Sequence, residues 1–348
     1  MEQTDIKSLN LTELTDYVKS LNEPAFRAKQ LYDWMHVKLV SRYEEMKNIP
    51  KSLIEKLAAN TFFASLNPVR IQESKEDGTK KYLFELSDGN YIESVLMKYK
   101  HGNSVCISSQ AGCRMGCKFC ASTLDGLSRN LTPSEMLDQI YRIQAHTGER
   151  VSNVVVMGTG EPFDNFDNFL KFAELLTDEN GLNISARNLT VSTCGIVPRI
   201  YELADKKLQL TLAVSLHSPT DELRKTLMPI ANKYSIAEIM DACRYYINKT
   251  GRRVTFEYSL VKDYNDTMEC ADTLAELVKG MNCHINLIPV NPIKERDFKK
   301  TEADMVARFK NRIEKGRVNA TVRRTLGSDI DASCGQLRKK YMEKDGLH

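Results

Sequence analysis

From about residue 103 onward, strand-like runs alternate with amphipathic helical segments, and this alternation limits the possible folds more than any other feature. The helical segments include TPSEMLDQIYRIQAHTG, where Thr132 and Glu135 predict a capping box, and SIAEIMDACRYYINKTG. Repeated βα units predict an α/β fold with a parallel sheet, closed or partly closed into a barrel, and chemistry at the carboxyl ends of its strands. The predicted strands are VCISS, NVVVMG, NLTVST, LTLAVSLH, RVTFEYSLV, HINLIPV and NATVRRT.

The first hundred residues have a different pattern. Up to about residue 62, the segments NLTELTDYVKSL, AFRAKQLYDWMH and PKSLIEKLAANTFF predict short helices. From Asn67 the runs VRIQES, KKYLFELS and NYIESVLMKY, separated by the turn sequences EDG and DGN, predict a small β-meander. We therefore expect a helical and β-meander accessory domain over residues 1–98 and a core domain over residues 99–348.

Composition narrows the class of protein. Of 348 residues, 42% are hydrophobic and 27% are charged, and no apolar run approaches the roughly 18 residues that span a bilayer. The polar start resembles neither a signal nor a transit peptide, so we expect a cytoplasmic protein without membrane contact. Net charge is +3, but from Lys294 onward 15 Lys and Arg face 9 Asp and Glu. This basic excess suits a polyanion or, equally, a solvated helix face.

Nine cysteines in such a chain direct attention to metal ligation or catalysis, because cytosolic thiols are kept reduced. Cys113, Cys117 and Cys120 form a C-x3-C-x2-C motif in a loop with two glycines. A structural zinc site needs a fourth ligand, and none stands at a typical finger spacing. A disulfide fits less well still. Three thiolates suit a 4Fe-4S cluster with one iron left open to a second molecule.

The motif resembles the radical S-adenosylmethionine (SAM) superfamily, because Phe119 precedes its last cysteine and a strand precedes the loop. The resemblance implies a partial (βα)6-type parallel barrel, in which the open iron binds SAM and reductive cleavage yields a 5′-deoxyadenosyl radical. The sequence MGTGEP, with Gly158, Gly160 and Glu161 at a strand end, is similar to the superfamily motif for the SAM amino group. Alone, a Gly-x-Gly would be weak support.

Six ordered motifs narrow the resemblance to the RlmN/Cfr family of RNA adenine methyltransferases, over nearly the whole chain. They are CISSQAGC, NVVVMGTGEP, VSTCGIVP, AVSLHSP, NLIPVNP and DIDASCGQL. The resemblance implies that SAM contacts, besides those at Gly160 and Glu161, come from Ser192, Ser215, Leu216, His217 and Asn291.

The same resemblance implies catalytic roles for two further cysteines, Cys106 and Cys334. The C2 carbon of adenine is unactivated and cannot attack the SAM methyl group, whereas a thiolate can. The family implies that one SAM methylates Cys334 and that the radical from a second SAM activates this methyl group for addition to the base, so two SAM are used per turnover. Cys106 then forms a disulfide with Cys334 to release the product, and Glu93 accepts the ring proton.

The implied substrates are an adenosine in the peptidyl-transferase centre of 23S rRNA and the adenosine 3′ of the tRNA anticodon. A folded RNA must extrude the base, so the accessory domain and the basic C-terminal segment are expected to bind the surrounding RNA. A low-potential reductant such as flavodoxin and a monomeric state complete the family expectation.

Three alternatives remain at this point. A Cfr-type enzyme would methylate C8 and confer antibiotic resistance, but Pro162 after Glu161 and the sequence CASTLDG favour C2. A methylthiotransferase would need a second cysteine set, and no cysteine precedes Cys106. A non-catalytic RNA-binding iron–sulfur protein would have no use for Cys106 and Cys334. The histidines form no ligand set, and we expect packing roles for Cys194, Cys243, Cys270 and Cys283.

Overall fold

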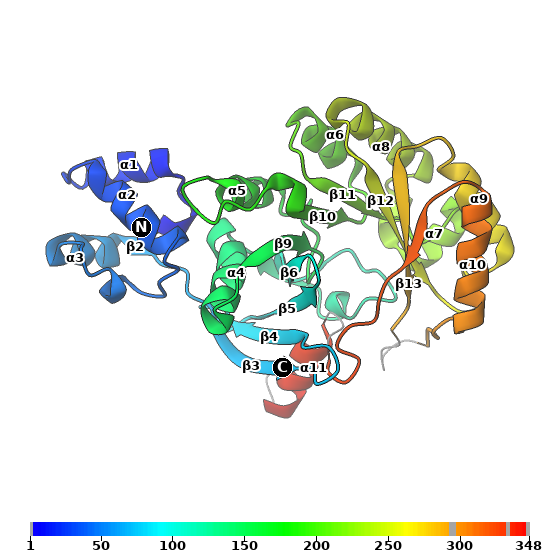
Figure 1. Ribbon diagram of the computed structural model, residues 1–348, viewed down its shortest axis with the longest axis horizontal. Coiled ribbons are helices and arrows are strands. Elements are labelled where there is room, and N and C mark those ends of the chain that lie inside the picture. The colour runs from blue at the N-terminus through cyan, green and yellow to red at the C-terminus, as the bar shows by residue number, and fades with distance from the viewer. Residues whose placement is uncertain (1–2, 292–296, 332–334, 346–348) are drawn as a thin grey trace.

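The computed structural model describes residues 3–291, 297–331 and 335–345 (Figure 1). In this part of the chain, a ten-stranded sheet has the order β14-β13-β12-β11-β10-β9-β6-β5-β4-β3. All seven strands predicted after residue 103 are confirmed, and they pair in parallel. They are β6 (Gly102–Ile107), β9 (Val151–Val156), β10 (Leu189–Thr193), β11 (Thr211–Ser215), β12 (Val254–Leu260), β13 (Cys283–Pro289) and β14 (Ala320–Val322).

Helices connect these strands and cover one face of the curved sheet, as Figure 1 shows. The first begins directly after Thr132, whose predicted capping box with Glu135 is present. The described helices of this part are α4 (Pro133–Thr147), α5 (Phe166–Thr177), α6 (Val197–Asp205), α7 (Asp221–Leu227), α8 (Ile236–Thr250), α9 (Met268–Leu277) and α10 (Ala303–Lys315), with the 3-10 turns η4 (Ala186–Asn188) and η5 (Pro229–Asn232).

Side chains alternate along each strand, so the two faces of the sheet differ in polarity. On β12, Phe256 and Tyr258 are fully buried in the main core, and the Tyr258 ring lies 5.5 Å from the ring of Phe309 on α10. Glu257, between them, points to the opposite face and accepts a hydrogen bond from Asn286 of β13 at 2.9 Å. The helices therefore cover an apolar face, and the inner face of the parallel half is polar.

The N-terminal helices pack beside α4 and α5. Lys7 forms a fully buried ion pair with Asp138 of α4 at 2.9 Å, and Tyr32 donates a hydrogen bond to Asp178 at 2.6 Å. These contacts join the accessory part firmly to the core. Its elements are β1 (Thr4–Asp5), η1 (Ile6–Ser8), α1 (Leu11–Ser20), α2 (Phe26–His36), η2 (Tyr43–Glu45), α3 (Lys51–Asn60) and β2 (Thr61–Phe62), with β1 parallel to β2.

The predicted meander is present as β3 (Asn67–Glu73), β4 (Lys80–Glu85) and β5 (Tyr91–Tyr99). These strands are antiparallel, and β5 pairs with β6, so the meander extends the parallel sheet. One sheet thus crosses the boundary proposed after residue 98. No helix among the described residues is long and apolar enough to cross a bilayer.

Two short stretches complete the fold. Between β6 and α4, the hairpin of β7 (Gln110–Gly112) and β8 (Leu127–Asn130) encloses residues 113–120, which we call the cysteine loop, and η3 (Ala121–Thr123). After β14, residues 326–331, which we call the strap, run along the turn between β3 and β4 and lead towards α11 (Gln336–Asp345). The ring of Tyr341 on α11 lies 5.4 Å from that of Tyr91 on β5, and Figure 1 shows α11 at the meander end of the sheet.

Candidate active site

The cysteine loop is held mainly by its backbone. The Cys113 N–H donates to the Gly126 carbonyl at 2.7 Å, and the Lys118 N–H donates to the Leu227 carbonyl at 2.9 Å. Gly112, just before the loop, has φ +81°, and a Cβ atom there would lie 2.1 Å from the Gly126 oxygen. Glycine is therefore required at the entrance to the loop.

The three predicted metal ligands lie near one another. Cys113 and Cys117 are buried and Cys120 is half-buried. Burial, with the proximity of Cys120 and Glu161, raises the pKa of Cys113 to about 12, and burial beside Cys120 and Cys113 raises that of Cys117 as well. Over the described residues, no three His, Cys, Asp or Glu side chains already stand at metal-binding distances. Three neighbouring thiols are nevertheless a soft donor set that fits an iron–sulfur cluster.

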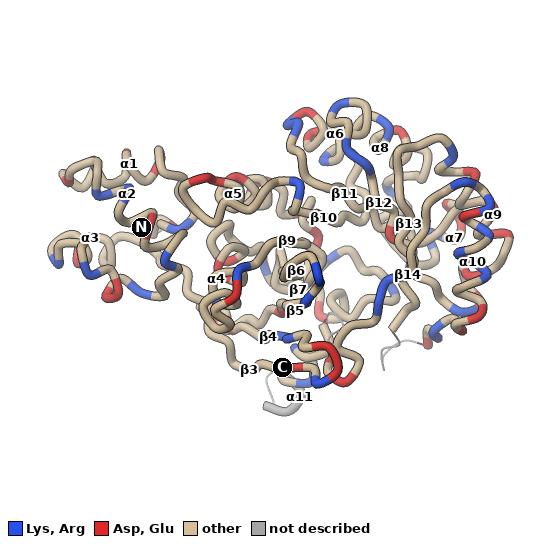
Figure 2. The backbone as a smooth tube through the Cα atoms, in the orientation of Figure 1, with Lys and Arg blue, Asp and Glu red and all other residues tan. Residues whose placement is uncertain are grey.

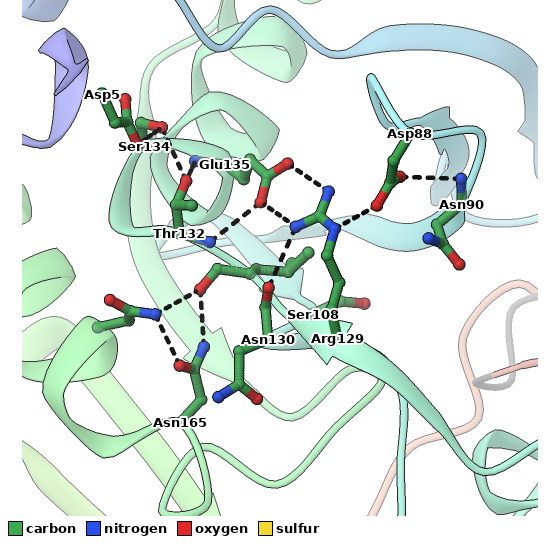
Figure 3. Close-up of polar contacts among 12 residues, drawn as sticks. Asp5, Asp88, Asn90, Ser108, Arg129, Asn130, Thr132, Ser134, Glu135 and Asn165 are labelled. Carbon is green, nitrogen blue, oxygen red and sulfur yellow. Dashed lines mark hydrogen bonds and ion pairs between the residues drawn. The ribbon is translucent and has the colours of Figure 1, made fainter. Parts of the chain in front are cut away.

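A polar network fixes the hairpin that carries this loop (Figure 3). Arg129 of β8 donates from Nη1 and Nη2 to the Glu135 carboxylate at 2.7 and 2.8 Å, and from Nε to Asp88. Asn165 donates to the carbonyls of Ser109 and Leu131 at 2.9 and 2.8 Å. The hairpin is thus tied to α4, to the β4–β5 turn and to the segment after β9.

The MGTGEP segment packs closely against the end of β6. A Cβ atom at Gly158 would lie 2.7 Å from the Ile107 oxygen, and one at Gly160, where φ is +109°, would lie 2.6 Å from Gln110 Cβ. The buried Glu161 carboxylate accepts the N–H of Cys194 at 2.7 Å and that of Phe163 at 3.0 Å. It therefore joins the ends of β9 and β10, and the SAM contact predicted at Glu161 stays a prediction.

The expected SAM contacts on β10 and β11 lie at adjacent strand ends. Ser192 Oγ is 3.4 Å from Ser215 Oγ, and the N–H groups of Leu216 and His217 donate to the Glu257 carbonyl at 3.1 and 3.2 Å. These polar groups meet at the carboxyl edge of the parallel sheet, as predicted.

His217 faces the cysteine loop. Its Nδ1 accepts the Ser259 N–H at 2.9 Å, and its ring centroid is 4.9 Å from that of Phe119. Burial, assisted by the neighbouring Arg224 charge, lowers the pKa of His217 to about 3. The imidazole is therefore neutral at physiological pH and carries its proton on Nε2.

Cys106 and Asn291 line the same cavity of about 400 Å³. Cys106 is buried on β6, opposite Val95 of β5 and Val155 of β9. Gln336, two residues after Cys334, also lines this cavity, as do Arg323 and Arg324 after β14. The cavity thus reaches from the meander side of the sheet to its far edge.

Cys334 itself lies outside the described residues. No disulfide is present among the cysteines that the structure describes, so the disulfide expected between Cys106 and Cys334 has no support here. Cys243 and Cys283 are buried in the main core, in keeping with packing roles. Cys194 belongs with Cys117 to a small separate cluster of buried side chains beneath the cysteine loop.

Glu93 lies beside the C-terminal chain. Its carboxylate forms an ion pair with Lys81 of β4 at 2.9 Å and accepts the N–H groups of Gly335 and Arg338, each at 2.6 Å. Gly335 directly follows Cys334 in sequence, so the expected proton acceptor binds the residue next to the expected catalytic cysteine in the chain.

Sequence reasoning missed three charged residues near these groups. Lys81 stands at a buried position of KKYLFE, and Glu257 stands alone among apolar residues in VTFEYSL; a lone charge on a buried strand was the available signal. Arg224 of α7 is fully buried and donates to the carbonyls of Cys194, Ser215 and Leu216 at 2.6, 3.3 and 3.1 Å. No local sequence pattern indicates the position of Arg224 beneath the strand ends.

Comparison with known proteins agrees with this geometry. Residues 107–302 match the profile of the radical SAM superfamily, and residues 4–62 match that of a ribosomal RNA large subunit methyltransferase N-terminal domain. The chain is 69% identical over 340 residues, 98% of its length and 97% of the relative, to a probable dual-specificity RNA methyltransferase RlmN of Lachnospira eligens. It is 60% identical over 343 residues, 99% and 96% of the two chains, to the protein so named in Lachnoclostridium phytofermentans.

A solved structure extends the agreement to the fold. A radical SAM methyltransferase from Sphaerobacter thermophilus superposes with a TM-score of 0.92 at 42% sequence identity. The match covers 96% of this chain and 98% of the other. The expected radical SAM fold with an N-terminal accessory part is therefore confirmed.

Proposed function

Since the chain belongs to the RlmN family of radical SAM RNA methyltransferases, we propose that it methylates C2 of an adenine in both 23S rRNA and tRNA. The observation that carries the proposal is the meeting of three groups at one end of the sheet. These are the cysteine loop, Cys106 in its cavity, and the chain next to Cys334, which Glu93 binds.

Membership of the superfamily implies an iron–sulfur cluster and SAM as cofactors. In our proposal Cys113, Cys117 and Cys120 hold a 4Fe-4S cluster, which when bound supplies the electron that cleaves SAM. We assign SAM binding to the strand ends at Gly160, Glu161, Ser192, Ser215, Leu216, His217 and Asn291. The assignment is supported by the place of these groups at adjacent strand ends, where Ser192 Oγ lies 3.4 Å from Ser215 Oγ.

The protein's own residues have distinct tasks in this proposal. Cys334 accepts a methyl group from one of two SAM used per turnover, because a thiolate attacks that methyl group and an aromatic C2 does not. Glu93 accepts the ring proton. The Cys106 thiolate closes a disulfide with Cys334 as the product leaves, and an external two-electron reductant resets the pair.

RNA binding is assigned to the accessory part and to the basic C-terminal region. In Figure 2 Lys and Arg are interspersed with Asp and Glu along the N-terminal helices and α10. Part of the C-terminal excess is neutralised, because Arg312 pairs with Asp272. Arg323 and Arg324 lie at the cavity mouth, where they suit phosphate contacts. We further propose a cytoplasmic monomer that is served by a flavodoxin-type reductant.

Nucleoside mass spectrometry tests the proposal. The reconstituted protein is incubated anaerobically with SAM, a reductant and unmodified 23S rRNA or tRNA. We expect 2-methyladenosine in both RNAs, its loss in Cys106→Ala and Cys334→Ala, and its retention in the control Cys270→Ala on α9. 8-Methyladenosine would instead support the Cfr-type reaction, and no modified adenosine with a loaded cluster would support an RNA-binding protein.

A further inference from the structure

The ion pair between Lys81 and Glu93 is buried almost completely. Lys81 Nζ lies 2.9 Å from Glu93 Oε2, and the two side chains are 0% and 4% exposed. They come from neighbouring antiparallel strands, where Leu83 is the register partner of Glu93. Desolvating two charges is costly, and the cost is recovered only when further hydrogen bonds satisfy both groups. The other partners of the pair therefore indicate its purpose.

Those partners lie on the C-terminal chain. Lys81 Nζ donates to the Asp331 carbonyl at 2.6 Å. On the other side, Glu93 Oε2 accepts the Gly335 N–H at 2.6 Å and Oε1 accepts the Arg338 N–H at 2.6 Å. The pair thus binds the chain immediately before and immediately after residues 332–334, which include Cys334.

The same piece of chain also contacts the cysteine loop region. Gly335 has φ +78°, and a Cβ atom there would lie 3.0 Å from Ala121 Cβ and 3.2 Å from Ser122 N. Arg338 forms an ion pair with Asp125. Ala121 and Ser122 directly follow Cys120. The residue after Cys334 is therefore held between the ion pair and the end of the cysteine loop.

We propose that Lys81 is a positioning residue for the C-terminal chain that carries Cys334. Together with Glu93 it holds Asp331 and Gly335, the described residues on either side of 332–334. The inference rests on the proposed function for the role of Cys334, but the bracketing contacts themselves do not. Lys81 acts through Glu93 and Asp331.

A purely structural ion pair would behave differently. Replacing a buried pair by neutral side chains is often neutral or stabilising, so a pair that served only the sheet could be removed without consequence for α11. A pair that positions the C-terminal segment cannot be removed without loosening that segment.

Hydrogen exchange of the apo chain gives the first test. The variants are Lys81→Met, Lys81→Arg and the neutral double variant K81M/E93Q, which leaves no unpaired buried charge if K81M fails to fold. The control is Lys98→Met on β5, whose ion pair with Glu149 is exposed. We expect amides of 335–345 to exchange about ten-fold faster in K81M and in the double variant, near wild-type protection in K81R, and no change in K98M. Wild-type protection of this segment in K81M or K81M/E93Q would overturn the proposal.

Single-turnover chemistry gives the second test. In the reconstituted enzyme, methylation of Cys334, measured by peptide mass spectrometry, should fall about 100-fold in K81M, as expected for a group displaced by about 1 Å. K81R should recover most of that loss, and iron content should match wild type because the three ligand thiols are unchanged. Wild-type methylation of Cys334 in K81M would overturn the positioning role. Absence of any methylation in the wild-type enzyme would contradict the proposed function. The hydrogen-exchange result would still test whether the ion pair holds the C-terminal chain.

Discussion

The cysteine loop and the strap are held in opposite ways. The loop depends mainly on backbone hydrogen bonds, such as those from Cys113 to Gly126 and from Lys118 to Leu227, and on a glycine conformation. The strap depends on side-chain carboxylates and on partners far away in sequence: Asp329 accepts the Ser74 hydroxyl at 2.6 Å across 255 residues, and Gly327 donates to Asp77 at 2.9 Å across 250 residues. One of the two segments is fixed mainly by backbone contacts and the other mainly by side-chain carboxylates.

This difference makes the two segments respond differently to solvent conditions. A cluster ligand set must keep its geometry, and a loop defined mainly by its backbone changes little with pH and salt. Charged and side-chain contacts respond to pH and salt, whereas close backbone packing does not.

The largest expected effect is the loss of stability of the cysteine loop in Gly112→Ala. In Gly112→Ala the new Cβ atom would lie 2.1 Å from a carbonyl oxygen at φ +81°, so we expect a loss of about 3 kcal/mol in the free energy of unfolding and failure to retain iron. Gly126→Ala is the matched control, since φ is +71° there but no atom lies within 4 Å of the added Cβ; about 1 kcal/mol is expected. Denaturant titration and iron analysis measure both. Equal effects of the two variants would contradict the steric argument.

A smaller effect is expected on the local stability of the strap in Ser74→Ala. Ser74→Ala removes the hydroxyl that Asp329 accepts and leaves the amides of Glu76 and Asp77 without it, so about 1–2 kcal/mol of local stability should be lost. Amides in 326–331 should exchange roughly ten-fold faster, with iron content unchanged. Ser20→Ala, at an exposed position of α1, is the control and should leave amide exchange in the strap unchanged. Faster exchange in the cysteine loop of Ser74→Ala would show that the two segments are not independent.

The contribution of Asp77 should depend on pH. Partial burial alone would raise the pKa of Asp77, but hydrogen bonds from Gly327 and Thr79 outweigh it and lower the pKa to about 2. Because the folded value lies below the unfolded one, the stabilisation is present at neutral pH and is lost as the pH falls from about 4 to about 2. After allowance for solvent screening it is about 1 kcal/mol.

Asp77→Asn should therefore be less stable than wild type at pH 7 and equally stable near pH 2. Thermal unfolding of both proteins across this range gives the difference directly. A difference that stayed constant with pH would show that the Asp77 charge does not hold the strap.

Salt should give the smallest effect. Trypsin can cleave after exposed Arg324, next to the strap, and after exposed Lys118, in the cysteine loop. Raising salt from 0.1 to 1 M screens the carboxylate contacts, so the ratio of the two initial cleavage rates should shift about two-fold towards Arg324. The ratio corrects for the effect of salt on the protease. A shift of the ratio towards cleavage after Lys118 would show that salt loosens the cysteine loop more than the strap.

Local pattern was enough to predict much of the molecule. The seven parallel strands, the capping box at Thr132 and the glycine-containing cysteine loop depend on nearby residues, and each is present. The pairing of β5 with β6, which makes the meander part of the main sheet, depends on register between distant segments and was not predicted.

The same limit applies to the site. Lys81, Asp331 and Gly335 come together only in the folded chain, because 250 residues separate the first two. No spacing in the sequence therefore indicates the contacts on either side of residues 332–334. Arg224 was also missed, because its partners are backbone carbonyls and the amino-acid sequence does not reveal which carbonyls a side chain will meet. The roles of Glu93 and the SAM contacts stay predictions that the experiments above can test.

The course of the strap also has a consequence for assembly during translation. The chain emerges from the ribosome N-terminal end first, and Cys120 precedes the strap by about 200 residues. The cysteine loop and the meander are therefore available to one another while the strap and α11 are still unmade. A cofactor delivered during synthesis therefore reaches the cysteine loop before the strap and α11 have been translated.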